Sequence, residues 1–130
     1  MVRGLKQLGL ALMVGLVAGL ASVLVLLSPA GADVSAPGLA EHLSQVGARM
    51  YGAYWCSHCA EQKQTFGAAF AQVPYVECDP QGAQAQTQLC RDKGIQGFPT
   101  WEIEGQLYPG TRSLEELVAL SHYNDFKSSF

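Results

Sequence analysis

Basic residues are scarce in this chain, and they form no cluster. The sequence has 130 residues, with eight Lys and Arg against eleven Asp and Glu. All eleven acidic residues but only six of the basic ones lie from residue 33 onward, which gives that part a net charge of about −5. Without a basic patch, the chain lacks the electrostatic footprint of a nucleic-acid-binding protein. No internal repeat is present, and the length favours a single domain.

Charge is absent from the twenty residues Leu8–Leu27, a run long enough to span a bilayer as a helix. Arg3 and Lys6 precede the run, and Ala30 and Ala32 after it have the small-x-small spacing of a signal peptidase site. The segment is therefore interpreted as a cleaved signal peptide or as an uncleaved membrane anchor. The length of the run favours the anchor. Both interpretations place the rest of the chain outside the cytoplasm.

Only four cysteines are present, all beyond the hydrophobic run: Cys56, Cys59, Cys78 and Cys90. Four cysteines in a small exported domain suit an oxidising compartment. A structural zinc site usually shows two short-spaced ligand pairs, and only Cys56–Cys59 is short-spaced, so no metal site is predicted. For Cys78 and Cys90 a structural disulfide is favoured, worth about 3 kcal/mol. A second redox pair and two free thiols remain alternatives.

Apolar periodicity and turn residues predict alternating helices and strands in the exported part. Helices are expected at 38–46, from the short-spaced cysteines to about 72, at 83–93 and from 114 to about 120. Ser113 and Glu116 have the spacing of a capping box at the start of the last helix. Strands are expected at 50–54, 73–78, 100–103 and 106–108. This order predicts an α/β fold, a mixed four-stranded sheet flanked by helices and preceded by one N-terminal hydrophobic helix. Three parts are expected: residues 1–32 as the signal or anchor, residues 33–46 as a linker and short helix, and residues 47–130 as the domain that contains all four cysteines.

The segment Tyr54–Cys59 holds two cysteines separated by two residues, a spacing that allows a disulfide within one helical turn. An aromatic residue before the first cysteine is typical of redox sites on a strand-to-helix turn. About 40 residues later, Gly94–Thr100 contains Pro99, a candidate cis-proline lying against the pair. Together the two segments resemble the thioredoxin family over roughly residues 47–121.

Five shorter segments carry a narrower resemblance. They are Trp55–Cys59, Val76–Cys78, Cys90, Gly97–Trp101 and Ser113–Leu117. They look like the thioredoxin-like domain joined to vitamin K epoxide reductase homologues of photosynthetic organisms. In that family the domain follows the last membrane helix, whereas here a single hydrophobic segment takes that place.

The resemblance implies a role for each residue of the cysteine motif. Cys56, at a helix N-terminus and in an exposed position, is expected to attack as the thiolate, and Cys59 is expected to resolve the mixed disulfide. Trp55, Ser57 and His58 are expected to tune the site. In the family, His before the second cysteine accompanies the oxidising members, but those members usually have Pro where this chain has Ser57.

Two further expectations follow from the family pattern. Phe98 and Pro99 are expected to seat the substrate chain. Many thioredoxins carry a buried carboxylate six residues before the first cysteine, which relays protons to the resolving thiol. Met50 stands there and cannot do so. Proton transfer at Cys59 must therefore use water or another group, or be slow.

The sequence thus predicts an exported thiol–disulfide oxidoreductase that needs no cofactor beyond its redox-active disulfide. We expect a disulfide donor to folding proteins, reoxidised by a quinone-linked membrane partner of the vitamin K epoxide reductase type. The periplasm and the thylakoid lumen both fit. The alternatives are a membrane-anchored thiol reductant, as in cytochrome c maturation, and a non-catalytic thioredoxin-like binding module. His42, His122, Glu102 and Glu104 are expected to face water.

Overall fold

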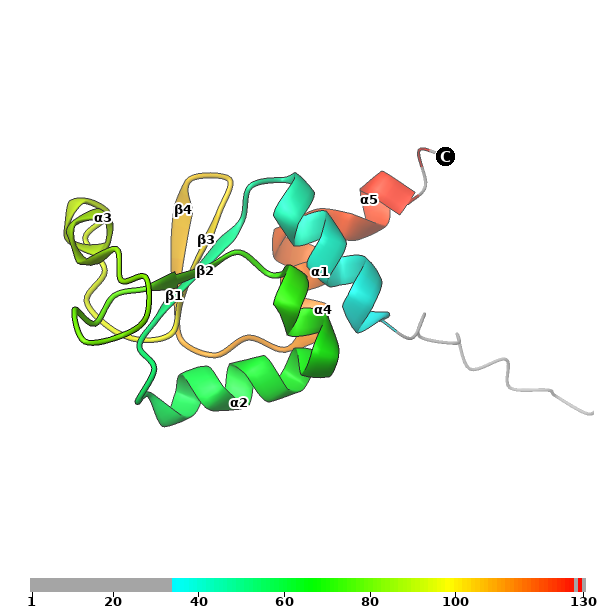
Figure 1. Ribbon diagram of the computed structural model, residues 1–130. Coiled ribbons are helices and arrows are strands. Elements are labelled where there is room, and N and C mark those ends of the chain that lie inside the picture. Colours follow the sequence, from blue (N-terminus) through cyan, green and yellow to red (C-terminus); the bar gives the residue numbers. More distant parts are fainter. Residues whose placement is uncertain (1–33, 128, 130) are drawn as a thin grey trace, which may run out of the picture. The chain divides into compact units, whose positions relative to one another are not determined.

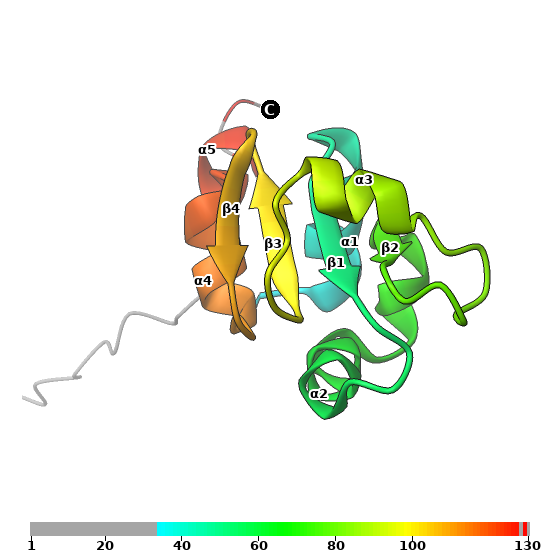
Figure 2. The same cartoon turned by 90° about the vertical axis from the view of Figure 1, so that its left-hand side faces the viewer.

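A mixed sheet of four strands, in the order β2-β1-β3-β4, organises the molecule (Figure 2). The computed structural model describes residues 34–127 and 129, which belong to one compact unit, residues 32–130. The strands are β1 (Arg49–Gly52), β2 (Tyr75–Glu77), β3 (Thr100–Ile103) and β4 (Gln106–Pro109). β1 pairs in parallel with β2, and the pairings β1–β3 and β3–β4 are antiparallel. The predicted mixed four-stranded sheet is confirmed.

Helices cover both faces of the sheet (Figure 1). On one face lie α1 (Ala36–Gln45), α2 (Ser57–Phe66), the 3₁₀ helix η1 (Gly67–Gln72) and α4 (Leu114–Leu120). On the other face lies the short α3 (Thr87–Asp92), which stands in front of the sheet in Figure 2. A last helix, α5 (Tyr123–Lys127), follows α4. We name the two sides the α2 face and the α3 face.

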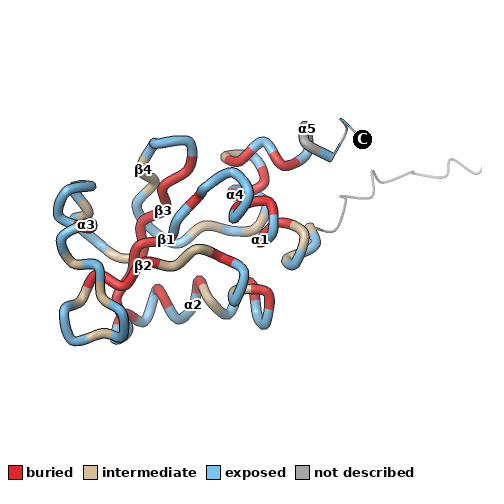
Figure 3. Tube along the Cα trace, turned by 45° about the horizontal axis from the view of Figure 1, so that its top comes forward, coloured by how far each residue is buried: buried red, intermediate tan, exposed pale blue. Residues whose placement is uncertain are grey.

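Alternation along the strands separates two clusters of buried side chains, one on each face. The larger cluster, on the α2 face, includes Leu39, Leu43, Met50, Trp101 and Leu117. The smaller cluster, on the α3 face, consists of Tyr51, Val76, Cys78 and Cys90. Figure 3 shows the buried residues concentrated along the strands and the inner sides of the helices. Because α1 contributes to the larger cluster, it is part of the packed domain.

The predicted helices differ from the structure at four places. The first helix begins at Ala36, two residues earlier than expected, with Pro37 in its first turn. The helix after the cysteine pair ends at Phe66, because Gly67 takes a left-handed backbone (φ 57°), and η1 follows. Residues 83–86 are not helical. Gln84 has φ 55°, and the N–H of Gln86 donates to the carbonyl of Glu77, so this segment packs back on β2 before α3 begins. The helix α5 was not predicted. The predicted capping box of Ser113 and Glu116 is confirmed.

The predicted signal or anchor segment, residues 1–32, lies outside the described residues. Among the helices that the structure does describe, none has the length and apolar character needed to cross a membrane.

Candidate active site

Cys56 lies where the chain leaves β1 and starts α2, at the N-cap of the helix. Its backbone is extended, with φ −76° and ψ 118°, and its N–H donates to the carbonyl of Ala53 at 3.1 Å. Its Sγ accepts a hydrogen bond from the backbone N–H of Cys59 at 3.3 Å. The sulfur therefore takes the place of a capping oxygen. A negative charge on this sulfur is stabilised by that N–H and by the positive end of the helix.

Cys59 lies one turn into α2 and is only 1% exposed. Burial raises the pKa of the Cys59 thiol to about 12, and its hydrogen bond with Cys56 adds to this effect. Cys56 is also buried, at 8% exposed, although an exposed position was expected. The expectation was wrong because the segment before β3 covers the sulfur. The two thiols still differ, since the helix N-terminus stabilises one anion and the apolar surroundings oppose the other.

Phe98 and Pro99 lie against the cysteine pair, and the peptide bond between them is cis, as predicted. The thiol of Cys56 donates to the carbonyl oxygen of Phe98 at 3.6 Å. The Thr100 hydroxyl donates to the carbonyl of Gly97 at 2.8 Å and fixes this turn from within. This contact places a backbone carbonyl of the cis-proline turn directly beside the Cys56 sulfur.

The rim of the site is aromatic and exposed. Tyr54 is 58% exposed and Trp55 is 62% exposed. The indole N–H of Trp55 donates to Asp79 Oδ2 at 2.8 Å, and its ring meets Phe98 edge-on at 6.2 Å between centroids. The backbone N–H of Gln81 and then the indole of Trp55 hold the pKa of Asp79 below its ordinary value. Asp79 thus fixes the exposed ring beside Cys56, a contact that the sequence did not indicate.

His58 points to solvent and pairs with a carboxylate instead of with Cys56. Its Nδ1 lies 3.0 Å from Glu61 Oε2, and the two side chains are 68% and 62% exposed. Glu61 offsets the positive charge of a protonated ring, and water screens what remains. The expected tuning of Cys56 by His58 stays a prediction. Ser57 begins α2 and is exposed.

Gly52 and Tyr75 lie behind Cys59, and Glu77 is hydrogen-bonded to Tyr75. A Cβ atom on Gly52 would stand 2.9 Å from Cys59 Sγ, 2.9 Å from Tyr75 Cε2 and 3.2 Å from the Tyr75 hydroxyl oxygen. Glycine is therefore required here by close approach. Met50 is fully buried on the same strand and carries no ionisable group. Sequence reasoning missed Tyr75 and Glu77, because only the β1–β2 register brings them beside Cys59.

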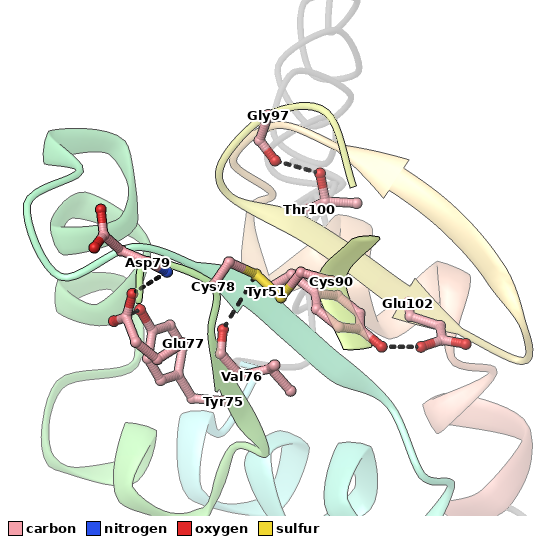
Figure 4. Close-up of a disulfide and its surroundings, with 10 residues drawn as sticks. All are labelled: Tyr51, Tyr75, Val76, Glu77, Cys78, Asp79, Cys90, Gly97, Thr100 and Glu102. Atoms are coloured by element: carbon pink, nitrogen blue, oxygen red, sulfur yellow. Dashed lines mark hydrogen bonds between the residues drawn. A yellow bond between two sulfur atoms is a disulfide. The ribbon is translucent and has the colours of Figure 1, made fainter. Parts of the chain in front are cut away.

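Cys78 and Cys90 form a disulfide on the α3 face (Figure 4). It links the end of β2 to α3 and belongs to the cluster that contains Tyr51 and Val76. These two sulfurs are consequently unavailable as metal ligands alongside Cys56 and Cys59. Among the described residues, no group of three or more His, Cys, Asp or Glu is placed to hold a metal ion.

Two residues expected to face water are buried. His42 packs under α4, where its Nε2 lies 2.8 Å from the carbonyl oxygen of Ser121. Glu102 lies on β3, an inner strand rather than the expected edge. It accepts from the Tyr51 hydroxyl at 2.6 Å and from Lys93 Nζ at 2.5 Å. Burial opposes its ionisation, but the hydrogen bonds from Lys93 and Tyr51 hold the pKa of Glu102 below its ordinary value.

Comparison with known proteins gives two informative matches. The chain is 46% identical over 90 residues to thiol-disulfide oxidoreductase LTO1 of Arabidopsis thaliana, over 66% of this chain and 24% of that protein. It is 29% identical over 75 residues to protein disulfide-isomerase of Aspergillus niger, over 50% of this chain and 14% of that protein. The domain has a thioredoxin-like fold. Both names support a disulfide oxidoreductase.

The chain spans only a minor part of the length of both relatives, 24% of one and 14% of the other. No family model matches it.

Proposed function

We propose that the protein is an exported thiol–disulfide oxidoreductase that donates disulfides to folding proteins. One observation carries the proposal. Cys56 caps α2 with its sulfur, accepts the N–H of Cys59 and lies 3.6 Å from the Phe98 carbonyl at the cis-proline turn. A non-catalytic binding module would need neither a sulfur held at a helix N-terminus nor a peptide carbonyl aimed at it.

The surroundings of the two thiols favour a pair that oxidises its substrates. The helix N-terminus and the Cys59 N–H stabilise the thiolate of Cys56, and so stabilise the reduced pair over its disulfide. A stabilised reduced form makes the Cys56–Cys59 disulfide a better oxidant. Substrate cysteines would take over the disulfide, and two electrons would pass to the pair.

The reduction potential of the Cys56–Cys59 pair tests the direction. We expect a value well above that of thioredoxin, which is about −270 mV. A value near −270 mV would instead favour the alternative, a membrane-anchored thiol reductant, which the His58–Glu61 pairing supports because it offsets the oxidising influence of the histidine. If the pair exchanges with no dithiol buffer, both directions fail.

The substrates can be identified by trapping. In a Cys59→Ala variant the resolving thiol is missing, so mixed disulfides at Cys56 should accumulate and carry folding proteins with them. A Cys56→Ser variant is the matched control and should trap none. If the trapped proteins are instead apocytochromes, the result would favour a membrane-anchored thiol reductant that acts in cytochrome c maturation.

We also propose a quinone-linked membrane partner of the vitamin K epoxide reductase type, on the sequence resemblance of the Trp55–Cys59 and Gly97–Trp101 segments. The reduced full-length protein should be reoxidised by membranes that contain such an enzyme and not by membranes that lack it. Fractionation and N-terminal sequencing test the export segment. A mature N-terminus at Asp33 would identify a cleaved signal, and an intact membrane-bound chain would identify an anchor.

A further inference from the structure

Thiol–disulfide exchange at Cys59 needs a proton acceptor, because the Cys59 thiol is buried. The buried carboxylate that serves many thioredoxins in this role is replaced here by Met50. In the proposed reaction Cys59 must become a thiolate to resolve a mixed disulfide, or must take up a proton when it leaves as one. A thiol with a pKa of about 12 is almost wholly protonated at neutral pH. Met50, which lies on β1 behind the pair, cannot take that proton.

A tyrosine and a carboxylate occupy the space behind Cys59 from the neighbouring strand. The Tyr75 hydroxyl oxygen and Cys59 Sγ border the same point, the place of the missing Cβ of Gly52. The Tyr75 hydroxyl donates to Glu77 Oε2 at 2.8 Å. Burial raises the pKa of Tyr75, and the Glu77 carboxylate and the charges of Cys59 and Cys56 raise it further, so the phenol stays protonated.

Glu77 is a buried carboxylate held in one position. Its other oxygen, Oε1, accepts the backbone N–H of Asp79 at 2.9 Å (Figure 4). The side chain passes directly over Gly82, where any Cβ would collide with it. Only 6% of Glu77 is exposed, so it is shielded from bulk water while it stays in contact with Tyr75.

We propose that Tyr75 and Glu77 form the proton relay of Cys59, in place of the carboxylate that Met50 lacks. The inference rests on the proposed function, because a relay matters only if Cys59 exchanges. Tyr75 is the group beside the reacting sulfur. Glu77 acts through Tyr75, as a positioning residue that orients the hydroxyl and takes up the relayed proton.

The proton and electron transfers balance in both directions. When Cys59 resolves a mixed disulfide, its proton passes to the Tyr75 oxygen and the phenol proton passes to Glu77. The Cys59 thiolate then attacks Cys56 Sγ, and the partner sulfur leaves with the electron pair. When a partner thiolate attacks Cys56 in the disulfide, Cys59 leaves with the electron pair. It then takes a proton from Tyr75, and Glu77 returns to the phenol the proton that it took up when Cys59 resolved the earlier mixed disulfide.

The ionisable surroundings favour this path. From α2, Lys63 Nζ lies 4.0 Å from the centre of the Tyr75 ring, and its charge favours the Cys59 thiolate. From the turn after β2, the Asp79 carboxylate faces away, toward the indole of Trp55 and the N–H of Gln81. Tyr75, which borders the same point as Cys59 Sγ, is thus joined to a buried carboxylate.

The reaction of the reduced full-length protein with Ellman's reagent separates the two thiols in time. Cys56 attacks first and releases one coloured thiolate. Cys59 then attacks the mixed disulfide and releases the second. The second phase reports deprotonation of Cys59, and its rate is independent of reagent concentration because the step is intramolecular. Cys78 and Cys90 do not react, since they are joined.

We expect Glu77→Gln and Tyr75→Phe to slow the second phase about tenfold or more near neutral pH, and to leave the first phase unchanged. The deficit should shrink as pH rises toward the pKa of Cys59, because hydroxide then removes the proton directly. Gly82→Ala should act in the same way by displacing Glu77 without altering the chemistry of the pair. Glu77→Asp should restore part of the rate.

The α3 face offers a matched control. Tyr51 and Glu102 are a buried tyrosine–glutamate pair with a hydroxyl-to-carboxylate distance of 2.6 Å, but they lie away from Cys59. Tyr51→Phe and Glu102→Gln should leave both phases unchanged. The relay is refuted if Glu77→Gln leaves the second phase at the wild-type rate, or slows both phases equally. If the wild-type protein shows no first phase, the proposed function fails, and the relay with it.

Discussion

The two faces of the sheet carry the same side-chain types: two cysteines, a tyrosine and a glutamate. On the α2 face they are Cys56, Cys59, Tyr75 and Glu77, and on the α3 face they are Cys78, Cys90, Tyr51 and Glu102. One set is arranged for exchange and the other for cross-linking. The difference lies in the backbone and the counter-charges around each set, which shows that a residue inventory does not fix the chemistry.

On the α2 face, a helix N-terminus meets one sulfur and a peptide carbonyl lies beside it, so the cysteines are set up to react. On the α3 face, the cysteines lie at the end of a strand and inside a short helix, and their bond closes a loop. The glutamates differ as well. Lys93 compensates Glu102 with a full charge, whereas Glu77 is held by a phenol and a backbone N–H.

Removing the attacking sulfur should have the largest effect. Cys56→Ser leaves a capping oxygen at the start of α2 but no thiolate, so exchange with any dithiol should fall to the background rate. The fold should persist, because serine is a good N-cap residue. Stopped-flow exchange kinetics and far-UV circular dichroism measure the two outcomes. Residual exchange at more than a trace would mean that another sulfur attacks.

Removing both sulfurs of the α3 face should instead cost stability. Cys78→Ser with Cys90→Ser opens a loop of about twelve residues, worth about 3 kcal/mol of unfolding free energy in the chain-entropy model. Exchange at Cys56 should keep its wild-type rate at a temperature where the variant is folded. Urea denaturation measures the loss of stability, and the exchange assay measures the rate at Cys56. A folded variant without turnover would place the second pair in the electron path and end the contrast between the faces.

The sequence predicted the parts of the site that are local in the chain. The cysteine motif, the cis bond before Pro99 and the capping box at Ser113 each depend on a few adjacent residues. Local motifs carry their own physical signal, through helix caps, turn residues and the two-residue spacing of the thiols. The mixed sheet followed from the alternation of strands and helices.

The contacts that cross the sheet could not be predicted. Tyr75 reaches Cys59 only through the parallel register of β1 and β2, in which Met50 pairs with Tyr75 and Gly52 with Glu77. Glu102 was expected to face water, since strand periodicity alone does not tell an inner strand from an edge. Tyr75 and Glu77 alternate along β2 and so lie on one face of that strand. The sequence does not show that this face is the one beside Cys59 until the pairing of β2 with β1 is known.

Filling the space over Gly52 should damage the α2 face alone. In Gly52→Ala the new methyl group meets Cys59 Sγ and the Tyr75 ring, each at 2.9 Å, so one of them must move. We expect a loss of about 2 kcal/mol from overpacking, and a slower second phase with Ellman's reagent. Denaturation and thiol kinetics measure both. Gly97→Ala is the matched control, because a Cβ there meets nothing within 4 Å. If Gly52→Ala leaves the Cys59 kinetics unchanged, the neighbouring side chains can accommodate a methyl group at Gly52 without disturbing Cys59.

Replacing the Glu102 carboxylate on the α3 face should have the smallest effect on stability. The pH dependence of the free energy of unfolding should show that the effect comes from its charge. Glu102→Gln removes the charge that pairs with Lys93, whose side chain is 37% exposed, so water screens the pair and the loss of stability near neutral pH should be small. Because the pKa of Glu102 is lowered in the folded state, its contribution is present above its ordinary pKa of 4.5 and disappears as pH falls through the folded value.

The pKa of Lys93 is raised by its hydrogen bond with Glu102, so the pair also weakens as pH rises through the folded value above 10.5. The stability difference between wild type and Glu102→Gln should therefore have a plateau between about pH 5 and pH 10 and close at both ends. Urea denaturation across this range measures it. A difference that stays constant into acid would mean that the amide disturbs packing rather than charge, and the α3 face would then owe its stability to its disulfide and its apolar cluster.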